Sequence, residues 1–264
     1  MDRRAYLISV FADTQSLIAA SPALQASQQQ SIAAQRLVPE SAPLAQPAAA
    51  YTTEAEVIVS RRRSFEAALR YPGKRVCVLN FASATHPGGG VSVGSSAQEE
   101  CLCRCSTLYN CLNDKAVWEG FYTPHRLSGN ALNNDDLLYT PCVQIVKDDD
   151  YGLLATPVGV DVITCAAPDL RAARPGAVSP ETLLRLHEQR ARRILTVAAQ
   201  EQAEAVILGA FGCGAFGNDP LVVAQAYRNV LPEFVYHFRT IEFAVYCPPA
   251  NDDSNYRAFK IVLG

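Results

Sequence analysis

Two neighbouring acids, Glu99 and Glu100, follow closely after a triple glycine, Gly88-Gly-Gly90. Acidic residues are common in the first turn of a helix, because they complement the helix dipole. Here, however, they follow a glycine loop, and glycine lets a ligand approach the backbone closely. A carboxyl group held near apolar side chains can have a raised pKa and act as an acid. We therefore expect this pair to lie beside a bound ligand.

A second glycine-rich loop, from Gly209 to Gly217, follows the apolar run at 205–208 and precedes a helix signal at Asp219-Pro220. Successive backbone N–H groups in such a loop can bind an anion, and the helix N-terminus adds a favourable dipole. A single glycine cluster is more often only a tight turn. Two clusters, each placed after a strand, favour one ligand whose pyrophosphate lies across the sheet edge.

The spacing of Gly212, Gly214 and Gly217 also matches the nicotinamide-dinucleotide fingerprint. That fingerprint requires an early strand–loop–helix unit and an acidic residue at the end of the next strand. Here the motif lies near the end of the chain, and no carboxylate ends the next apolar run at 241–246. The sequence therefore does not favour an oxidoreductase.

Alternating strands and helices must position these loops. Short apolar runs predict strands at 75–81, 142–146, 160–164, 205–208 and 241–246. Cap-then-proline signals predict helices from Ser179-Pro180 and from Asp219-Pro220, the second reaching about Leu231. A helix beginning at Gln98 is expected to continue through Leu112. This alternation indicates an α/β fold whose sheet is covered on both faces.

The N-terminal part of the chain has a different composition. Residues 6–18 predict a short amphipathic helix. Residues 20–50 are rich in Ala, Gln, Ser and Pro, and predict a long surface connection. We therefore expect one catalytic domain over 1–264, with a helical and low-complexity extension at 1–50 and a core at 51–264.

Charge and cysteine content exclude several functions. The net charge of −3 gives no basic footprint for direct nucleic-acid binding. Most of the nine cysteines lie in apolar runs, which indicates reduced thiols and a cytoplasmic location. Cys101, Cys103 and Cys105 would diverge on a helix, so no structural zinc is expected. No apolar run approaches transmembrane length, so no membrane partner is expected.

The triple glycine, seven further residues and then Gln98-Glu-Glu100 resemble the signature of poly(ADP-ribose) glycohydrolases. The resemblance is closest to the bacterial type and extends from about residue 50 to the C-terminus. It also includes the segments 79–84, 97–102, 162–168 and 208–220. It implies a macrodomain-like mixed sheet sandwiched between helices. It also implies hydrolysis of ribose–ribose O-glycosidic bonds, with no metal and no cofactor.

The resemblance also implies roles for individual residues. Glu100 would be the acid, and then the base that activates water. Glu99 would hydrogen-bond the ribose hydroxyls, and Gln98 would belong to the same substrate-binding triplet. The first loop would let the distal ribose and pyrophosphate approach Gly88, Gly89 and Gly90. The second would hold the phosphates through the backbone of Gly212, Cys213, Gly214, Ala215, Phe216 and Gly217, with the Phe216 ring on the terminal ribose.

One position departs from the family pattern. His86 stands where asparagine is usual before the Pro-Gly-Gly-Gly sequence. Its ring could contact the distal ribose, or it could face solvent, and the sequence leaves both possibilities open.

Two other functions fit the same sequence. One is hydrolysis of mono-ADP-ribosyl groups, and the other is a macrodomain that binds ADP-ribose without cleaving it. The intact pair Glu99-Glu100 argues against a non-catalytic reader. The expected partner is ADP-ribose or its polymer on modified proteins, in the reversal of ADP-ribosylation during the DNA damage response. We expect the protein to be a monomer.

Overall fold

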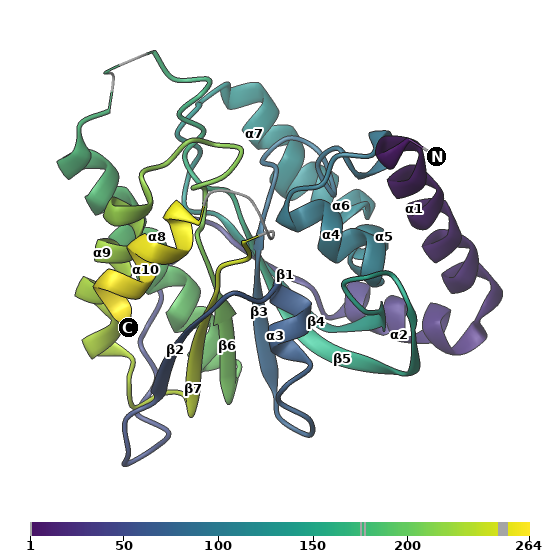
Figure 1. The fold of residues 1–264 in the computed structure, drawn as a ribbon, viewed down its shortest axis with the longest axis horizontal. Helices are drawn as coiled ribbons and strands as arrows, with labels where there is room; N and C mark the ends of the chain where they lie inside the picture. The colour runs from purple at the N-terminus through teal and green to yellow at the C-terminus, as the bar shows by residue number, and fades with distance from the viewer. Residues whose placement is uncertain (1, 175, 177, 248–252) are drawn as a thin grey trace.

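The expected mixed sheet is present in the computed structural model, which describes residues 2–174, 176, 178–247 and 253–264. Over these residues the sheet has seven strands in the order β1-β4-β5-β3-β6-β7-β2 (Figure 1). The pairs from β5 to β2 are parallel, whereas β1, β4 and β5 pair antiparallel. The strands are β1 (Arg36–Val38), β2 (Glu56–Ser60), β3 (Val76–Phe81), β4 (Leu137–Lys147), β5 (Leu153–Cys165), β6 (Ala205–Leu208) and β7 (Thr240–Ala244).

Helices cover both faces of this sheet, as the continuous apolar strands indicated. One group comprises α8 (Pro180–Gln200), α9 (Pro220–Val230), the 3-10 turn η3 (Leu231–Glu233) and α10 (Ser254–Leu263). The other group comprises α3 (Ser64–Ala68), the 3-10 turn η1 (Val91–Val93), α4 (Gln98–Cys105), α5 (Leu108–Leu112), α6 (Lys115–Val117), the π-helical turn η2 (Trp118–Tyr122) and α7 (Thr123–Ser128). The N-terminal helices α1 (Arg3–Ala20) and α2 (Pro22–Ala33) lie beside the second group (Figure 1).

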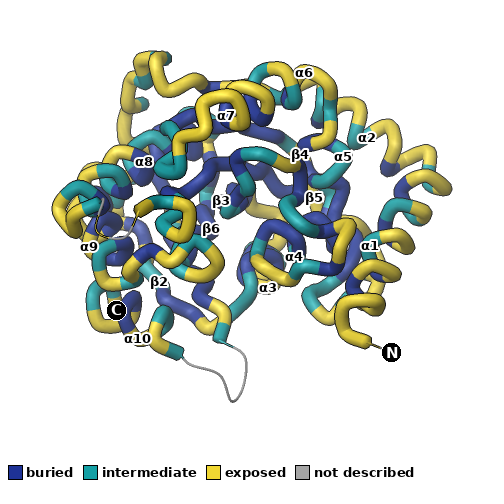
Figure 2. The backbone as a smooth tube through the Cα atoms, turned by 90° about the horizontal axis from the view of Figure 1, so that it is seen from above, coloured by how far each residue is buried: buried dark blue, intermediate teal, exposed yellow. Residues whose placement is uncertain are grey.

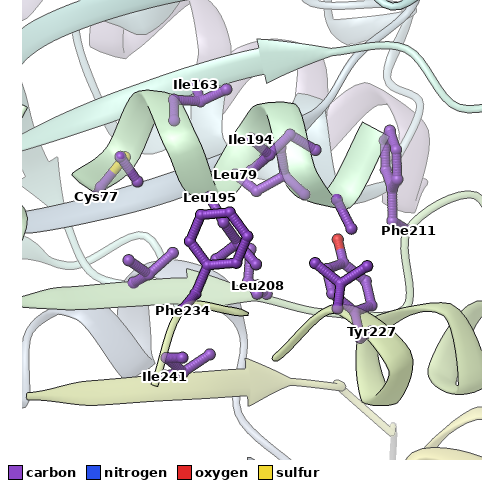
Figure 3. Packing of buried hydrophobic residues seen from close by; sticks show 14 of the residues in the cluster. Cys77, Leu79, Ile163, Ile194, Leu195, Leu208, Phe211, Tyr227, Phe234 and Ile241 are labelled. Carbon is purple, nitrogen blue, oxygen red and sulfur yellow. The ribbon is translucent and has the colours of Figure 1, made fainter. Parts of the chain in front are cut away.

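Strand β3 shows why its run is apolar without alternation. Cys77 and Leu79 pack with α8 and α9 in one core cluster, whereas Val76 and Val78 pack in the cluster on the other face. Figure 3 shows Leu79 near Ile194 of α8 in the first cluster. The central strands are buried along most of their length, and the outer helices turn exposed residues to solvent (Figure 2).

Both cap-then-proline predictions are confirmed. The Ser179 hydroxyl accepts a hydrogen bond from the N–H of Thr182 at the start of α8. The Asp219 carboxylate accepts one from the N–H of Leu221 at the start of α9. The second helix begins where the second glycine loop ends, so its N-terminus points toward that loop.

The prediction of a surface connection over 20–50 is wrong for its first half. Ser21 caps α2 by accepting from the N–H of Leu24, and Pro22 occupies the first turn. This is the same signal that was used at Ser179 and Asp219. Ala and Gln are good helix formers, so α2 needs few large apolar residues. Strand β1 then pairs with β4, so the sheet includes a strand from the segment assigned to the extension.

The predicted helix through Leu112 is interrupted. Ser106 has an extended backbone and forms a β-bridge with Ile145 of β4, so α4 ends at Cys105 and α5 begins at Leu108. Strand β7 ends at Ala244, two residues before the predicted boundary at Tyr246. The apolar patterns in the sequence indicated neither β2 nor α10.

Helix α1 packs against α4, the helix that begins with the acidic pair. The Thr14 hydroxyl donates to the carbonyl of Arg104 at 2.6 Å, and the rings of Phe11 and Tyr109 meet edge to face. The buried Lys147 ammonium pairs with the Asp13 carboxylate at 2.6 Å. Among the described helices none is by itself long and apolar enough to cross a membrane, although α1 and α2 together, with a 96° bend, reach that length and composition.

Candidate active site

A cavity of about 950 Å³ lies where β3, β6 and β7 end. Both glycine loops and the first turn of α4 contribute to its wall. Its lining includes Phe81, Ser83, Gly89, Gln98, Glu99, Glu100, Cys101, Arg171, Gly212, Gly214, Ala215, Phe216, Arg63 and Tyr246. The structure therefore brings together the two loops and the acidic pair that the sequence identified separately.

Gln98 fixes the start of α4 against the end of β3. Its side-chain Oε1 accepts from the N–H of Phe81 at 2.9 Å, and its Nε2 donates to the carbonyl of Leu79 at 2.7 Å. The same Nε2 donates to the Ser64 hydroxyl at 3.0 Å. Both ends of the amide are thus bound to the protein. Gln98 positions the acidic pair rather than offering its amide to a ligand.

Glu99 is held by two donors beneath the cavity. Its Oε1 accepts from Asn80 Nδ2 at 3.3 Å, and its Oε2 accepts from the N–H of Ser83 at 2.7 Å. Burial raises the pKa of Glu99 to about 8, and the charge of Glu100 contributes in the same direction. These two hydrogen bonds, and one with the Gly88 backbone, oppose this rise because they stabilise the charged form.

Glu100 is bound through only one of its oxygens. Oε1 accepts from the N–H of Gly90 at 2.9 Å. Oε2 is buried and has no hydrogen-bond partner among the residues that the structure describes. A buried carboxyl oxygen without a partner is costly to maintain, and such groups occur at functional sites. Glu100 therefore has one oxygen fixed by the first glycine loop and a second available for chemistry.

The triple glycine packs against the acidic pair, which the sequence reading did not foresee. Gly89 has φ +57°, and a Cβ placed there would lie 2.6 Å from Glu100 Oε1. A Cβ at Gly88 would meet the Tyr109 ring at 2.9 Å, and one at Gly90 would collide with Ser95. Of these three glycines only Gly89 lines the cavity in the described part of the chain. The three positions therefore require glycine because neighbouring side chains of the protein occupy the space of a Cβ.

The second loop presents free backbone donors. Within the described residues, the N–H groups of Gly214, Ala215 and Phe216 donate to no protein acceptor. All three residues line the cavity, and Gly214 and Ala215 are exposed. Consecutive free N–H groups are the arrangement that binds phosphate oxygens. Phosphate binding by this loop stays a prediction from the sequence.

Asn218 and His187 hold this loop in shape. Asn218 Nδ2 donates to the carbonyls of Pro168 at 2.7 Å and Gly212 at 3.0 Å. Its Oδ1 therefore accepts from His187 Nε2 at 2.9 Å, which fixes the tautomer of that ring. Burial lowers the pKa of His187 to about 4, so the ring stays neutral and remains a single donor on this side.

Aromatic and cationic side chains complete the wall. The guanidinium of Arg171 lies 5.3 Å from the centre of the Phe216 ring. The guanidinium of Arg63 lies 4.3 Å from the centre of the Tyr246 ring. The sequence reading missed Arg63, Tyr246 and Arg171. The first two lie just after β2 and β7, so their position after strand ends was the available signal.

His86 lies outside this arrangement. It is exposed, its Nδ1 is 2.9 Å from the Thr85 hydroxyl, and it is not among the described residues that line the cavity. Of the two possibilities left open by the sequence, the geometry favours the solvent-facing one. Cys213 lies in the loop with its thiol against the carbonyl of Phe211, and Gly217 forms the turn that closes the loop through the carbonyl of Gly214.

Comparison with known proteins identifies the family of this chain. The sequence profile for the microbial-type PARG catalytic domain matches residues 13–148, just over half of the chain. The chain belongs to the microbial-type PARG family. This family assignment agrees with the Gln98-Glu-Glu100 signature, which lies inside the matched region. No curated protein matches the chain significantly.

Solved structures of PARG, poly(ADP-ribose) glycohydrolase, resemble this chain over almost its full length. The enzyme from Thermomonospora curvata is 31% identical, with a TM-score of 0.88, over 98% of this chain and 99% of that one. A second structure of it, bound to the inhibitor ADP-HPD, is 29% identical over the same shares, with a TM-score of 0.85. The Deinococcus radiodurans enzyme in complex with ADP-ribose is 34% identical, with a TM-score of 0.79, over 92% of this chain and 97% of that one.

We predict that Gly89→Ala removes activity. The added Cβ would lie 2.6 Å from Glu100 Oε1, which is too close, so the Glu100 carboxylate would have to move. Gly129→Ala is the matched control. Gly129 has almost the same φ, +58°, and a Cβ there meets no described atom within 4 Å. Both changes introduce similar backbone strain, of about 1 kcal/mol. Measuring turnover and melting temperature of both variants separates the effect of backbone strain from that of moving the Glu100 carboxylate. Equal activity of Gly89→Ala and Gly129→Ala would contradict this role for Gly89.

We predict that His86→Asn leaves ADP-ribose affinity unchanged between about pH 5 and 8. The reason is its exposed position outside the cavity lining. Calorimetric titrations of the wild type and the variant at several pH values provide the measurement. Affinity curves that diverge with pH would return His86 to the binding site.

Proposed function

We propose that this protein hydrolyses the O-glycosidic bonds between ADP-ribose units, with Glu100 as the acid and then the base. The observation that carries the proposal is the asymmetry of Glu100. One of its oxygens is fixed by the N–H of Gly90, and the other is buried at the cavity without a partner among the described residues. The free N–H groups at 214–216 supply the phosphate site.

The reaction begins with ADP-ribose at the end of a polymer. Its pyrophosphate binds the free N–H groups of the second loop, and Glu99 hydrogen-bonds the ribose hydroxyls. Two buried carboxyls side by side do not both ionise readily, because each charge opposes the other. Because burial raises the pKa of Glu99 to about 8, the pair holds a proton at neutral pH, and this proton reaches the leaving ribose oxygen through Glu100 Oε2.

The second half of the reaction reverses the role of Glu100. Cleavage of the C–O bond leaves an oxocarbenium-like sugar and the Glu100 carboxylate. That carboxylate takes a proton from a water molecule, the water oxygen bonds to the sugar carbon, and Glu100 is protonated again. One group thus serves as acid and base. Glu99 cannot be an opposing nucleophile as in paired-carboxylate glycosidases, because it is adjacent in the chain and held by Asn80 and Ser83.

The same proposal includes the partners and cellular role expected from the sequence. ADP-ribose and its polymer on modified proteins are the ligands, and removal of ADP-ribose during the DNA damage response in the cytoplasm is the role. We also propose that the protein acts as a monomer. Comparing ADP-ribose release from the polymer and from mono-ADP-ribosylated protein distinguishes polymer hydrolysis from mono-ADP-ribosyl hydrolysis. Binding without release from either would indicate a reader.

We predict that Glu100→Gln lowers kcat by roughly 10²-fold or more, whereas ADP-ribose binding persists. The amide keeps the shape of the side chain but cannot donate an acidic proton. Asp149 provides a control, because it also lines the cavity and burial raises its pKa to about 6. Its Oδ2 accepts from the N–H of Glu66 at 2.7 Å, so it has a structural partner. Asp149→Asn should keep most of the activity, and the opposite ranking of the two variants would assign the acid to Asp149.

We predict that kcat/KM falls as the pH rises through about 8, because the acidic pair then loses its shared proton. The same raised pKa of Glu99 lowers the stability of the fold as the pH rises from about 4.5 to 8, since the unfolded chain ionises at its ordinary pKa. Melting temperatures over the same range therefore separate loss of the acid from unfolding. A rate that stays constant well above pH 8 in folded protein would be incompatible with a shared proton.

A further inference from the structure

Two more unpartnered polar atoms lie on the same side of the sheet as the acidic pair. Besides Glu100 Oε2, the buried atoms without a hydrogen-bond partner in the described residues include Asn80 Oδ1 and the Tyr122 hydroxyl. Both side chains are completely buried. They lie on the α4 side of the sheet, where Tyr122 packs in the same core cluster as Val78 of β3. Buried polar groups normally have partners, so the occurrence of three around one site calls for an explanation.

Asn80 has its amide orientation fixed by two acceptors. Its Nδ2 donates to Glu99 Oε1 at 3.3 Å and to the Thr164 hydroxyl at 3.2 Å. Its Oδ1 must therefore be an acceptor. In the described part of the chain no donor reaches it. Asn80 links Glu99 to the interior of the sheet layer through its side chain, whereas the other partners of Glu99 are the backbones of Ser83 and Gly88.

Tyr122 offers the complementary group. It ends the π-helical turn Trp118–Tyr122, and its ring contacts Phe121 at 5.1 Å and Trp118 at 5.3 Å between centroids. Such turns are rare and occur often at functional sites. Burial raises the pKa of Tyr122 well above its usual value, and the charge of Glu99 adds to the rise. The hydroxyl therefore keeps its proton and remains a hydrogen-bond donor, and it lies close enough to Glu99 for the charge of Glu99 to affect its pKa.

We propose that Tyr122 is a positioning residue, which donates toward Asn80 Oδ1 through one buried water and thereby holds Glu99 in place. With Oδ1 anchored, the Asn80 amide keeps its Nδ2 on Glu99 Oε1. Without that anchor the amide can rotate, and Glu99 keeps only its backbone partners, Ser83 and Gly88. This inference rests on the proposed function, in which Glu99 orients the ribose beside Glu100.

The effect should appear in turnover rather than in binding. The phosphates are held by the second loop, which Tyr122 does not contact among the described interactions. Glu99 acts on the sugar at the bond that breaks. A Tyr122→Phe variant should therefore lower kcat by roughly tenfold, as expected when a hydrogen bond that supports a charged group is lost. KM and ADP-ribose affinity should stay within about twofold of the wild type.

Tyr227→Phe is the matched control. The Tyr227 hydroxyl is also buried and unpartnered in the described residues, but it lies on α9 in the opposite core cluster, with its ring against Phe243. Each variant loses one buried hydroxyl and keeps the aromatic ring, so both variants should remain folded, which their melting temperatures check. Only Tyr122→Phe should slow turnover. If Tyr122→Phe does not fold, Asn80→Ala removes the acceptor at the other end of the chain and should show the same loss of kcat.

A second measurement does not depend on activity. The Asn80 hydrogen bond lowers the pKa of Glu99, so Tyr122→Phe should raise that pKa further above its value of about 8. Carbon NMR of glutamate-labelled protein measures it in both tyrosine variants. The other titratable side chains that act on Glu99 and Tyr122 are Glu100, Cys103 and Tyr109, and they are unchanged in these variants.

The outcomes are distinguishable. A fall in kcat with an upward shift of the Glu99 titration in Tyr122→Phe alone supports the chain from Tyr122 to Glu99. Unchanged kcat and an unchanged titration overturn it, and so does an equal effect of Tyr227→Phe. If the wild type releases no ADP-ribose, the proposed function fails, and the NMR titration still decides whether Tyr122 positions Glu99.

Discussion

The structure depends on keeping two carboxyl groups buried side by side at the start of one helix. Removing a charged carboxyl from water is expensive unless donors reach its oxygens. Three elements supply those donors: the first glycine loop through Gly90, the end of β3 through Asn80, and the segment after it through Ser83. Since all three must meet α4 at once, the position of that helix is critical, and Gln98 fixes it to the backbone of β3.

The two glycine loops need glycine for different reasons. In the first loop, Gly89 has no side chain because the Glu100 carboxylate occupies the space where a Cβ would lie. In the second loop, a Cβ at Gly214 would meet no described atom within 4 Å, so the backbone is open to a ligand there. Glycine thus allows close packing within the protein in one case and close approach of phosphate in the other. Because both loops use glycine, this difference in role is not visible in the sequence.

Much of this arrangement could be predicted from local patterns. Strand β3 and the caps at Ser179 and Asp219 depend on neighbouring residues. The triplet Gln98-Glu-Glu100 is recognisable by its spacing from the triple glycine. The errors arose where tertiary contacts decide. Ser106 interrupts a helical pattern because it pairs with Ile145 of a distant strand. The roles of Gln98, Tyr122 and Asn80 depend on partners far away in the chain. Arg63 and Tyr246, separated by most of the sequence, stack only because β2 and β7 are neighbours in the sheet.

The proposed phosphate site consists mainly of backbone N–H groups in a protein whose net charge is −3. Partial charges fixed in a loop attract an anion over a short range only, and dissolved ions screen them far less than they screen a field of exposed lysines and arginines. Recognition by this loop therefore changes little with ionic strength. It also gives no long-range attraction to the many other polyanions of a cell, so a ligand with two phosphates is selected by shape and not by total charge.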